Sequence, residues 1–176
     1  MPRALLVVPR EQLSVSQYRR IRLSLEQQGF QVQVAASRPE EINWTDLRLT
    51  PDLSLTTAKG SDYDLVVFVG GRGNKELWNN PAAHQVARDA LAAGRVIGAS
   101  GAAVCILANA GVLQDRRATG PLSIAAALKQ RGAKYTPGPV ATDDAIVTLR
   151  KSEALSPFMQ QLLEKVRQRA EVKKAA

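Results

Sequence analysis

Short runs of apolar residues alternate along the chain with stretches in which apolar residues recur every three or four positions. The runs ALLVV (residues 4–8), DLVVFVGG (64–71) and RVIGAS (95–100) are largely apolar, which is typical of strands buried on both faces of a parallel sheet. FQVQVAAS (30–37) alternates before it turns apolar and predicts a further strand. The pattern therefore predicts a sheet with a buried centre.

Helical patterns follow these strands. Residues 14–29 place apolar side chains on one face and end at a glycine, and Ser14 and Gln17 have the spacing of a capping box. Residues 79–94 open with two asparagines and a proline, and Asn before Pro is typical of a helix start. Further helices are predicted in three later stretches: 101–111, 121–132 and from residue 156 onward.

The remaining stretches predict edge structure. Residues 38–60 are rich in turn formers and predict a short edge hairpin around LSLTT (53–57), RRATG (116–120) is strand-like, and VATDDAIVTL (140–149) predicts a hairpin around two aspartates. Buried strands that alternate with helices predict an α/β fold, a doubly wound parallel sheet with helices on both faces. We expect one domain over 1–176.

Composition narrows the class of protein. The chain is 45% apolar and 23% charged, as in ordinary globular domains, and its apolar N-terminal run is too short for a signal sequence or a membrane span. We therefore expect a cytoplasmic protein. The single cysteine, Cys105, excludes an internal disulfide and a zinc cage of cysteines, and we expect no metal or cofactor.

The net charge of +8 permits attraction to anions but does not identify a partner. Basic residues are scattered and then concentrate in the tail, where residues 167–176 are candidates for disorder. No aromatic interleaving and no helix-turn-helix or RNA-binding signature accompanies them. A solvated basic surface is the simpler interpretation, and we expect neither specific nucleic-acid binding nor membrane association.

Ligands of doubly wound sheets bind beyond the carboxyl ends of the strands, so the loops there carry the candidate chemistry. The first such loop, PREQLS (9–14), lacks the glycines of a dinucleotide site, and GGRGNKEL (70–77) lacks the end of a Walker A motif. The glycines of the second loop, with Arg72 and Lys75, could hold an anion. Alternatively, the loop is only a tight connection.

The remaining candidate groups do not form a recognisable catalytic set. His84 is predicted within the first turns of a helix, where a surface or packing role is expected, so no Ser-His-Asp triad is visible. Cys105 lies among apolar neighbours and is expected to be a core residue. Glu11 either faces the cleft beyond the first strand or is a solvated loop carboxylate.

Four segments also carry a resemblance to a known family: YDLVVFVGGRG (63–73), ALAAGRVIGA (90–99), LANAGVLQDRRATG (107–120) and VATDDAIVTLRKSEALSPF (140–158). They are similar, in this order, to the landmarks of the DJ-1/ThiJ/PfpI superfamily, relatives of the class I glutamine amidotransferases. The resemblance implies a flavodoxin-like sandwich and a homodimer. Active members include proteases, glyoxalases, hydratases and proposed deglycases.

The resemblance also implies a cysteine on a sharp strand-to-helix turn, the nucleophile elbow. A count without gaps from LANAGVL puts Gly101 in the place of that cysteine and Ala102 in the place of a histidine, whereas Cys105 falls four residues late. The same reasoning places Ser14 where the family's glutamate is expected and leaves Glu11 slightly early. Gly70 and Gly71 resemble the oxyanion-side loop, although Val69 replaces the usual proline.

Three functions follow from these residues. The leading hypothesis is a catalytically degenerate member of the family that binds or regulates through its dimer surface or a remnant pocket, formed by Glu11, Gly70, Gly71, Ser100, Gly101 and Ala102. An active hydrolase, glyoxalase or deglycase-type enzyme would need relocated residues, Ser100 or Cys105 with Glu11; GASGA superficially resembles the Gly-x-Ser-x-Gly elbow. An anion-binding module would use Arg72 and Lys75.

Overall fold

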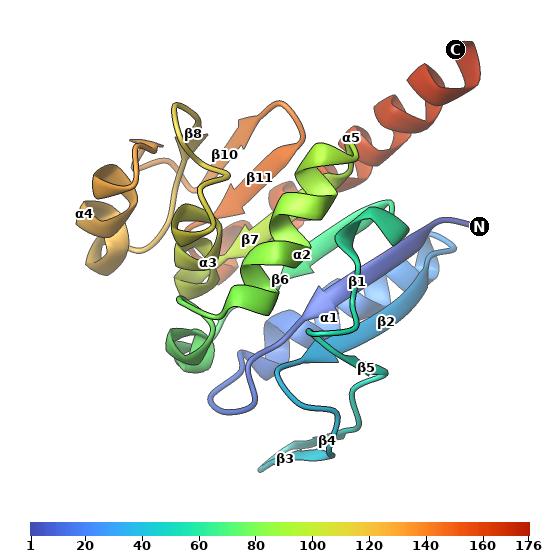
Figure 1. The fold of residues 1–176 in the computed structure, drawn as a ribbon, viewed down its shortest axis with the longest axis vertical. Coiled ribbons are helices and arrows are strands. Elements are labelled where there is room, and N and C mark those ends of the chain that lie inside the picture. The colour runs from blue at the N-terminus through green and yellow to red at the C-terminus, as the bar shows by residue number, and fades with distance from the viewer.

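The computed structural model describes residues 1–176, and its centre is a seven-stranded sheet in the order β10-β11-β7-β6-β1-β2-β5 (Figure 1). All neighbouring strands in this sheet run parallel except β10, which is antiparallel to β11. Its strands are β1 Arg3–Val7, β2 Gln31–Ala36, β5 Leu53–Ser54, β6 Leu65–Phe68, β7 Val96–Ser100, β10 Val140–Asp143 and β11 Ile146–Leu149.

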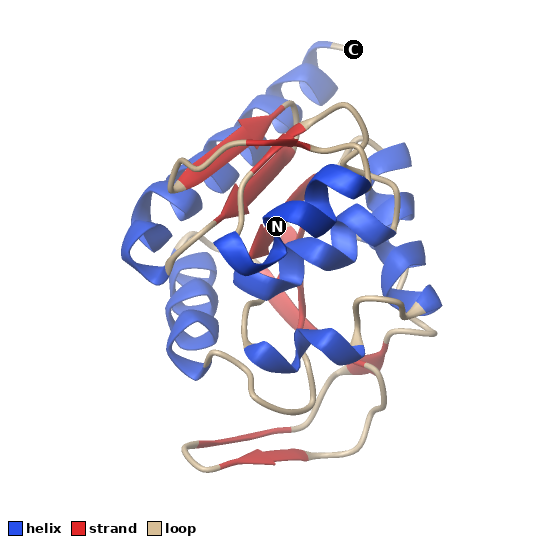
Figure 2. Cartoon of the chain, turned by 90° about the vertical axis from the view of Figure 1, so that its left-hand side faces the viewer, coloured by secondary structure: helices blue, strands red, loops and turns tan.

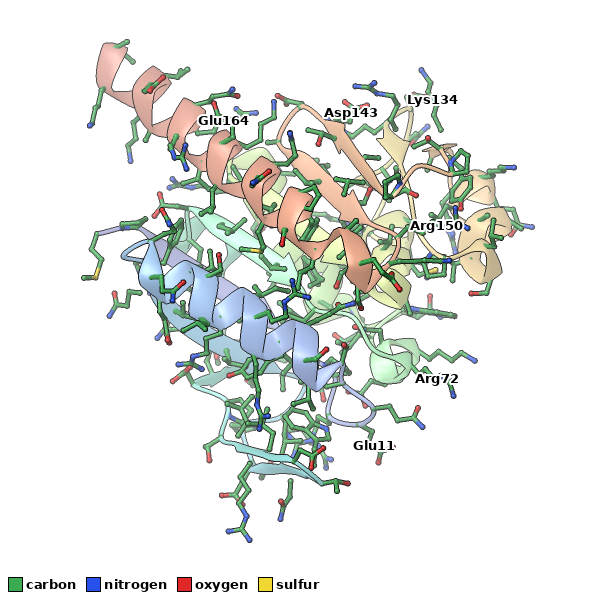
Figure 3. The ribbon with its side chains drawn as sticks, turned by 180° about the vertical axis from the view of Figure 1, so that it is seen from behind. Glu11, Arg72, Lys134, Asp143, Arg150 and Glu164 are labelled. Atoms are coloured by element: carbon green, nitrogen blue, oxygen red, sulfur yellow. The ribbon has the colours of Figure 1, made fainter.

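Helices cover both faces of this sheet. They are α1 Val15–Gln27, α2 Pro81–Ala92, α3 Val104–Asn109, α4 Leu122–Gln130 and α5 Leu155–Ala175, with short 3-10 turns η1 Gly60–Asp62, η2 Arg72–Glu76, η3 Gly101–Ala103 and η4 Ser152–Ala154. In Figure 1, α2 and α3 lie in front of the sheet, and Figure 3 shows α1 and α5 on the opposite face. None of the helices is both long and apolar enough to cross a membrane.

The core consists of two layers because strand side chains alternate between the faces. Leu5 and Val7 of β1 pack with α2 and α3, whereas Ala4 and Leu6 of the same strand pack with α1 and α5. Every residue of the central strands β6 and β7 is buried, which explains why both are continuous apolar runs in the sequence. The doubly wound α/β fold predicted from the sequence is confirmed.

The edge hairpin is not where the sequence analysis placed it. It is formed by β3 Ile42–Trp44 and β4 Leu47–Leu49, an antiparallel pair that projects from the body (Figure 2). The predicted site, 53–57, instead begins with β5, which joins the main sheet parallel to β2 at Ala35 and Ala36. Leu55 then turns into the core with 2% exposure, and this burial favours attachment to the sheet edge over a free hairpin.

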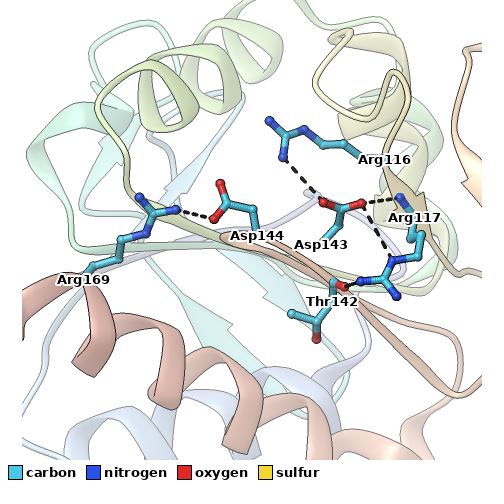
Figure 4. Close-up of polar contacts among 6 residues, drawn as sticks. All are labelled: Arg116, Arg117, Thr142, Asp143, Asp144 and Arg169. Atoms are coloured by element: carbon cyan, nitrogen blue, oxygen red, sulfur yellow. Dashed lines mark hydrogen bonds and ion pairs between the residues drawn. The ribbon is translucent and has the colours of Figure 1, made fainter. Parts of the chain in front are cut away.

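The predicted hairpin around Asp143 and Asp144 is present as β10 and β11. Figure 4 shows its turn linked to two other elements: Asp143 accepts a hydrogen bond from the backbone N–H of Arg117, at 2.8 Å, and Asp144 pairs with Arg169 of α5, also at 2.8 Å. Arg117 belongs to β8 Arg117–Ala118, which pairs with β9 Lys134–Tyr135 outside the main sheet. Helix α5 continues to Ala175, so the basic tail has a helical backbone.

Candidate active site

The sharp strand-to-helix turn expected after RVIGAS (95–100) is present at the carboxyl end of β7. Ser100 is still extended, with φ −122° and ψ 141°, and Gly101 then takes φ +56° before η3 leads into α3. This left-handed conformation is costly for residues with a Cβ and free of that cost for glycine. A Cβ built on Gly101 would meet nothing within 4 Å, so the apex of the turn has no side chain but has room for one.

The hydroxyl of Ser100 is held in a buried hydrogen-bond network directly below this turn. It donates to Gln17 Oε1 at 2.8 Å and accepts from the Gly70 N–H at 2.8 Å, and Ser100 is 0% exposed. Gln17 in turn donates through Nε2 to Ser152 Oγ, at 2.8 Å. The hydroxyl of Ser100 therefore has both a hydrogen-bond donor and an acceptor inside the protein. Its acceptor is a neutral amide oxygen, which cannot act as a base.

Gln17 is a site residue that the sequence analysis missed. The capping box predicted for Ser14 and Gln17 is not formed, since α1 has no side-chain cap, and Gln17 is buried instead. A signal was present in the sequence: Gln17, Ile21 and Leu25 are four residues apart, so a polar residue occupies the apolar stripe of the helix. Such a residue needs a buried partner, and Ser100 supplies it.

The glycine loop after β6 is shaped by close backbone contacts with the loop that follows β1. A Cβ on Gly71, whose φ is +133°, would lie 2.3 Å from the carbonyl oxygen of Gln12, and one on Gly73 would lie 1.7 Å from that of Glu11. Asn74 fixes the loop from below by donating to the carbonyls of Val69 and Gly71, both at 2.9 Å. The glycines therefore allow two loops to touch at the carboxyl end of the sheet.

His84 is held away from the elbow by the loop around Trp78. The Trp78 indole N–H donates to the Ala102 carbonyl at 2.8 Å, while the Trp78 carbonyl lies 2.7 Å from His84 Nε2 and accepts from Asn109 Nδ2 at 2.9 Å. The histidine supports the loop that packs beside Ala102. It forms no hydrogen bond with Ser100, whose hydroxyl bonds to Gly70 and Gln17 instead, so the chain's only imidazole is not the base of this hydroxyl.

Cys105 lies inside α3 and not on the turn. It is 2% exposed within the core on the α2 side, and burial raises the pKa of its thiol to about 11. The thiol is therefore neutral at physiological pH, and only the thiolate is a strong nucleophile. No set of three or more His, Cys, Asp and Glu side chains converges where it could hold a metal ion.

The charged candidates lie on the surface at the same end of the sheet. Figure 3 shows Glu11 and Arg72 on neighbouring loops with their side chains directed outward, and both residues are exposed. Lys75 is exposed as well, with its Nζ 5.9 Å from the centre of the Trp78 ring. None of the three forms an ion pair. The structure thus brings Gly70, Ser100 and Gly101 together and leaves Glu11 and Arg72 outside that cluster.

Comparison with known proteins identifies the family. The model of the DJ-1/PfpI family matches residues 3–165. The chain belongs to the DJ-1/PfpI family. It is 29% identical over 144 residues to an uncharacterized protein of Archaeoglobus fulgidus, with 79% of this chain and 83% of that protein covered. It is 25% identical over 137 residues to the glutathione-independent glyoxalase DJR-1.2 of Caenorhabditis elegans, covering 77% and 73%.

A solved structure shows the same fold. This is the two-domain protein of Anabaena variabilis that contains DJ-1/ThiJ/PfpI-like and ferritin-like domains, with a TM-score of 0.87 and 24% identity. The alignment covers 94% of this chain and 48% of that one, so the chain spans about half the length of the Anabaena protein. The flavodoxin-like sandwich expected from the resemblance is thus observed.

The residues at the turn can now be compared with those that the family resemblance implies. The residue that the gapless count put in the cysteine's place, Gly101, is also the residue with positive φ at the turn. The sequence count put the family's acid at Ser14, with Glu11 slightly early. The side chain that hydrogen-bonds to Ser100 is instead the amide of Gln17. Ser14 contributes only its backbone N–H, to the Gly70 carbonyl at 2.9 Å.

Proposed function

We propose that this chain is a catalytically degenerate member of the DJ-1/PfpI family that acts by binding, through its remnant pocket or a dimer surface. The observation that carries the proposal is the apex of the elbow, where Gly101 has a positive φ and no side chain. Residues that work as a catalytic unit are of little use singly. At this elbow the nucleophile position is a glycine, its neighbour Ala102 has no ionisable group, and Gln17 is an amide.

The rival function, an enzyme with relocated residues, has weaker support. Ser100 would need a general base within hydrogen-bond distance, and its partner is the Gln17 amide oxygen at 2.8 Å. Cys105 would need to be a thiolate, yet burial raises its pKa to about 11. Glu11 is exposed, whereas Ser100 and Cys105 are buried, and the hydroxyl of Ser100 bonds to Gly70 and Gln17 and not to Glu11.

Covalent labelling separates the two functions. We expect iodoacetamide and a fluorophosphonate to label neither Ser100 nor Cys105 in the folded protein, because both residues are buried and neither is activated. Intact-protein mass spectrometry before and after unfolding gives the readout, with alkylation of unfolded Cys105 as the positive control. Rapid, stoichiometric labelling of folded Ser100 would contradict degeneracy and favour the hydrolase.

An anion-binding module is the second candidate function. It is favoured because neither Arg72 nor Lys75 forms an ion pair with a carboxylate of the chain. Phosphate that binds the folded state raises the melting temperature by mass action. The rise should disappear in Arg72→Ala and persist in the matched variant Arg48→Ala, which removes an exposed arginine on β4. An equal rise in melting temperature with phosphate in the two variants would exclude this function.

We also propose that the chain forms a homodimer in the cytoplasm. Leu23 of α1 is 56% exposed beside a hollow of about 370 Å³ between α1 and α5, and an apolar side chain there suits an interface. Light scattering should give twice the 19.0 kDa of one chain. Leu23→Glu should yield a monomer, whereas Leu122→Glu, at a position that is 67% exposed on α4, should not.

A further inference from the structure

A groove of about 660 Å³ lies at the amino end of the parallel strands, the end of the sheet opposite the elbow. It runs between the second half of α5 and the segments that enter β1, β2 and β7. Phe30, Leu163 and Val166 contribute to its apolar floor, and Arg95, Lys173 and Lys174 to its rim. We call it the tail groove. Its volume is within the range of about 300 to 1,000 Å³ typical of ligand sites.

One face of α5 forms a wall of this groove. Leu163, Val166, Ala170 and Lys173 follow one another at spacings of three and four residues, which places them in one stripe along the helix. The stripe is apolar near the body and basic toward the end of the helix. Figure 1 shows that this end of α5 projects beyond the sheet. Met1 and Pro2 line the same groove. No other element of the chain covers that part of the stripe.

The charge of the groove is strongly positive. Asp64 is its only acidic residue, against five cationic ones: Arg95, Arg167, Arg169, Lys173 and Lys174. Arg95 Nη1 lies 3.7 Å from Asp64 Oδ1, and Arg169 pairs with Asp144 outside the groove (Figure 4). Lys173 and Lys174 are exposed and form no ion pair. Exposed pairs are weak, so an incoming carboxylate can compete for these cations.

We propose that the tail groove docks an acidic amphipathic helix of a partner protein. The apolar floor receives the side chains that recur every three or four residues on such a helix, and the lysines of the rim pair with its carboxylates. This site is separate from the elbow and does not depend on the chemistry there. A second copy of this chain is a poor occupant of this groove, because none of its helices carries an excess of carboxylates.

The shape of the site distinguishes a helix from a membrane. A bilayer surface is flat and can touch the projecting lysines, but it cannot reach Phe30, which is 8% exposed at the floor between the walls. A helix can place single side chains into a groove of this kind. The combination of a concave apolar floor with a basic rim therefore favours a peptide over anionic lipid.

Fluorescence anisotropy with a labelled peptide tests the proposal. The probe has about 20 residues, leucine at helical spacing on one face and glutamate on the other. We expect it to bind and the double variant Lys173→Glu/Lys174→Glu to weaken binding at least about tenfold. The matched double variant Lys59→Glu/Lys134→Glu changes the net charge equally at exposed sites outside the groove and should bind normally. Ala170→Glu, on the exposed wall, should weaken binding without changing the melting temperature.

Four outcomes would overturn the proposal. Equal weakening by both double variants would indicate diffuse charge attraction and no groove. A peptide of the same composition in scrambled order that binds equally well would show that the apolar floor plays no part. Failure of the probe to bind would remove the site. Vesicles rich in phosphatidylserine that bind through Lys173 and Lys174, and displace the probe, would assign the surface to membranes.

Discussion

Gly101 adopts a φ of +56° between β7 and α3, and the space that a Cβ would fill is empty. We expect Gly101→Cys to fold, at a strain cost of roughly 1 to 3 kcal/mol, which an ordinary domain can absorb. The new thiol would lie at the start of η3, which leads into α3, and the free backbone amides there lower its pKa. Its rate of alkylation as a function of pH measures that shift.

A matched variant makes this result specific to the elbow. Gly111 also has a positive φ, +83°, and open space, but it follows α3 and does not precede it. Gly111→Cys should cost similar stability and give a thiol with an ordinary pKa, because the end of a helix does not favour a thiolate. A buried, unreactive thiol in Gly101→Cys would mean that Gly101 is not the apex of the elbow.

The residues of the site also show the limit of local sequence patterns. Gly101 was placed by the family resemblance, through a gapless count from LANAGVL, which works because that segment and the turn are close along the chain. Gln17 could not be placed in this way, because its partner Ser100 is 83 residues away and a polar residue near the start of a helix equally suits a cap. Only the fold decides between those two roles.

Among the elements, the loops after β1 and β6 depend on each other through Gly71. We expect Gly71→Ala to destabilise the protein by at least about 1 kcal/mol, because a Cβ there would lie 2.3 Å from the Gln12 carbonyl and the φ of +133° is unfavourable for alanine. Gly138→Ala is the control, since its nearest neighbour would be 3.7 Å away. Urea unfolding gives both values; similar values for the two would contradict the close approach of the loops.

The elements differ in how well the sequence predicts them. Strands β1, β6 and β7 were predicted because both of their faces are buried, which leaves a continuous apolar run. The edge hairpin was misplaced because β3 and β4 pair only with each other and bury few residues, so their pattern resembles that of a loop. The tail of α5 is helical although its composition also suits disorder, since Lys, Arg, Glu and Ala are all good helix formers.

At the scale of the whole molecule, the family's architecture is present, and the proposed degeneracy depends on a few residues at one turn. The sheet and both helical layers have the DJ-1/PfpI fold. The polar groups at the turn hydrogen-bond to one another, in the network of Gln17, Ser100 and Gly70. Fold alone does not imply activity, so the central claim rests on the residues of the site.

Turnover of methylglyoxal by the unmodified chain tests this claim most directly, with the glyoxalase DJR-1.2 of Caenorhabditis elegans as the positive control. We expect no consumption of methylglyoxal above that of a blank without protein, and no difference between the chain and Ser100→Ala, because that change removes a structural hydroxyl and no catalytic group. Ser100→Ala should instead lose about 1 to 3 kcal/mol of stability, since it leaves the Gly70 N–H and Gln17 Oε1 unpaired. Robust turnover by the folded chain would contradict degeneracy, and its loss in a folded Ser100→Ala would identify that hydroxyl as catalytic.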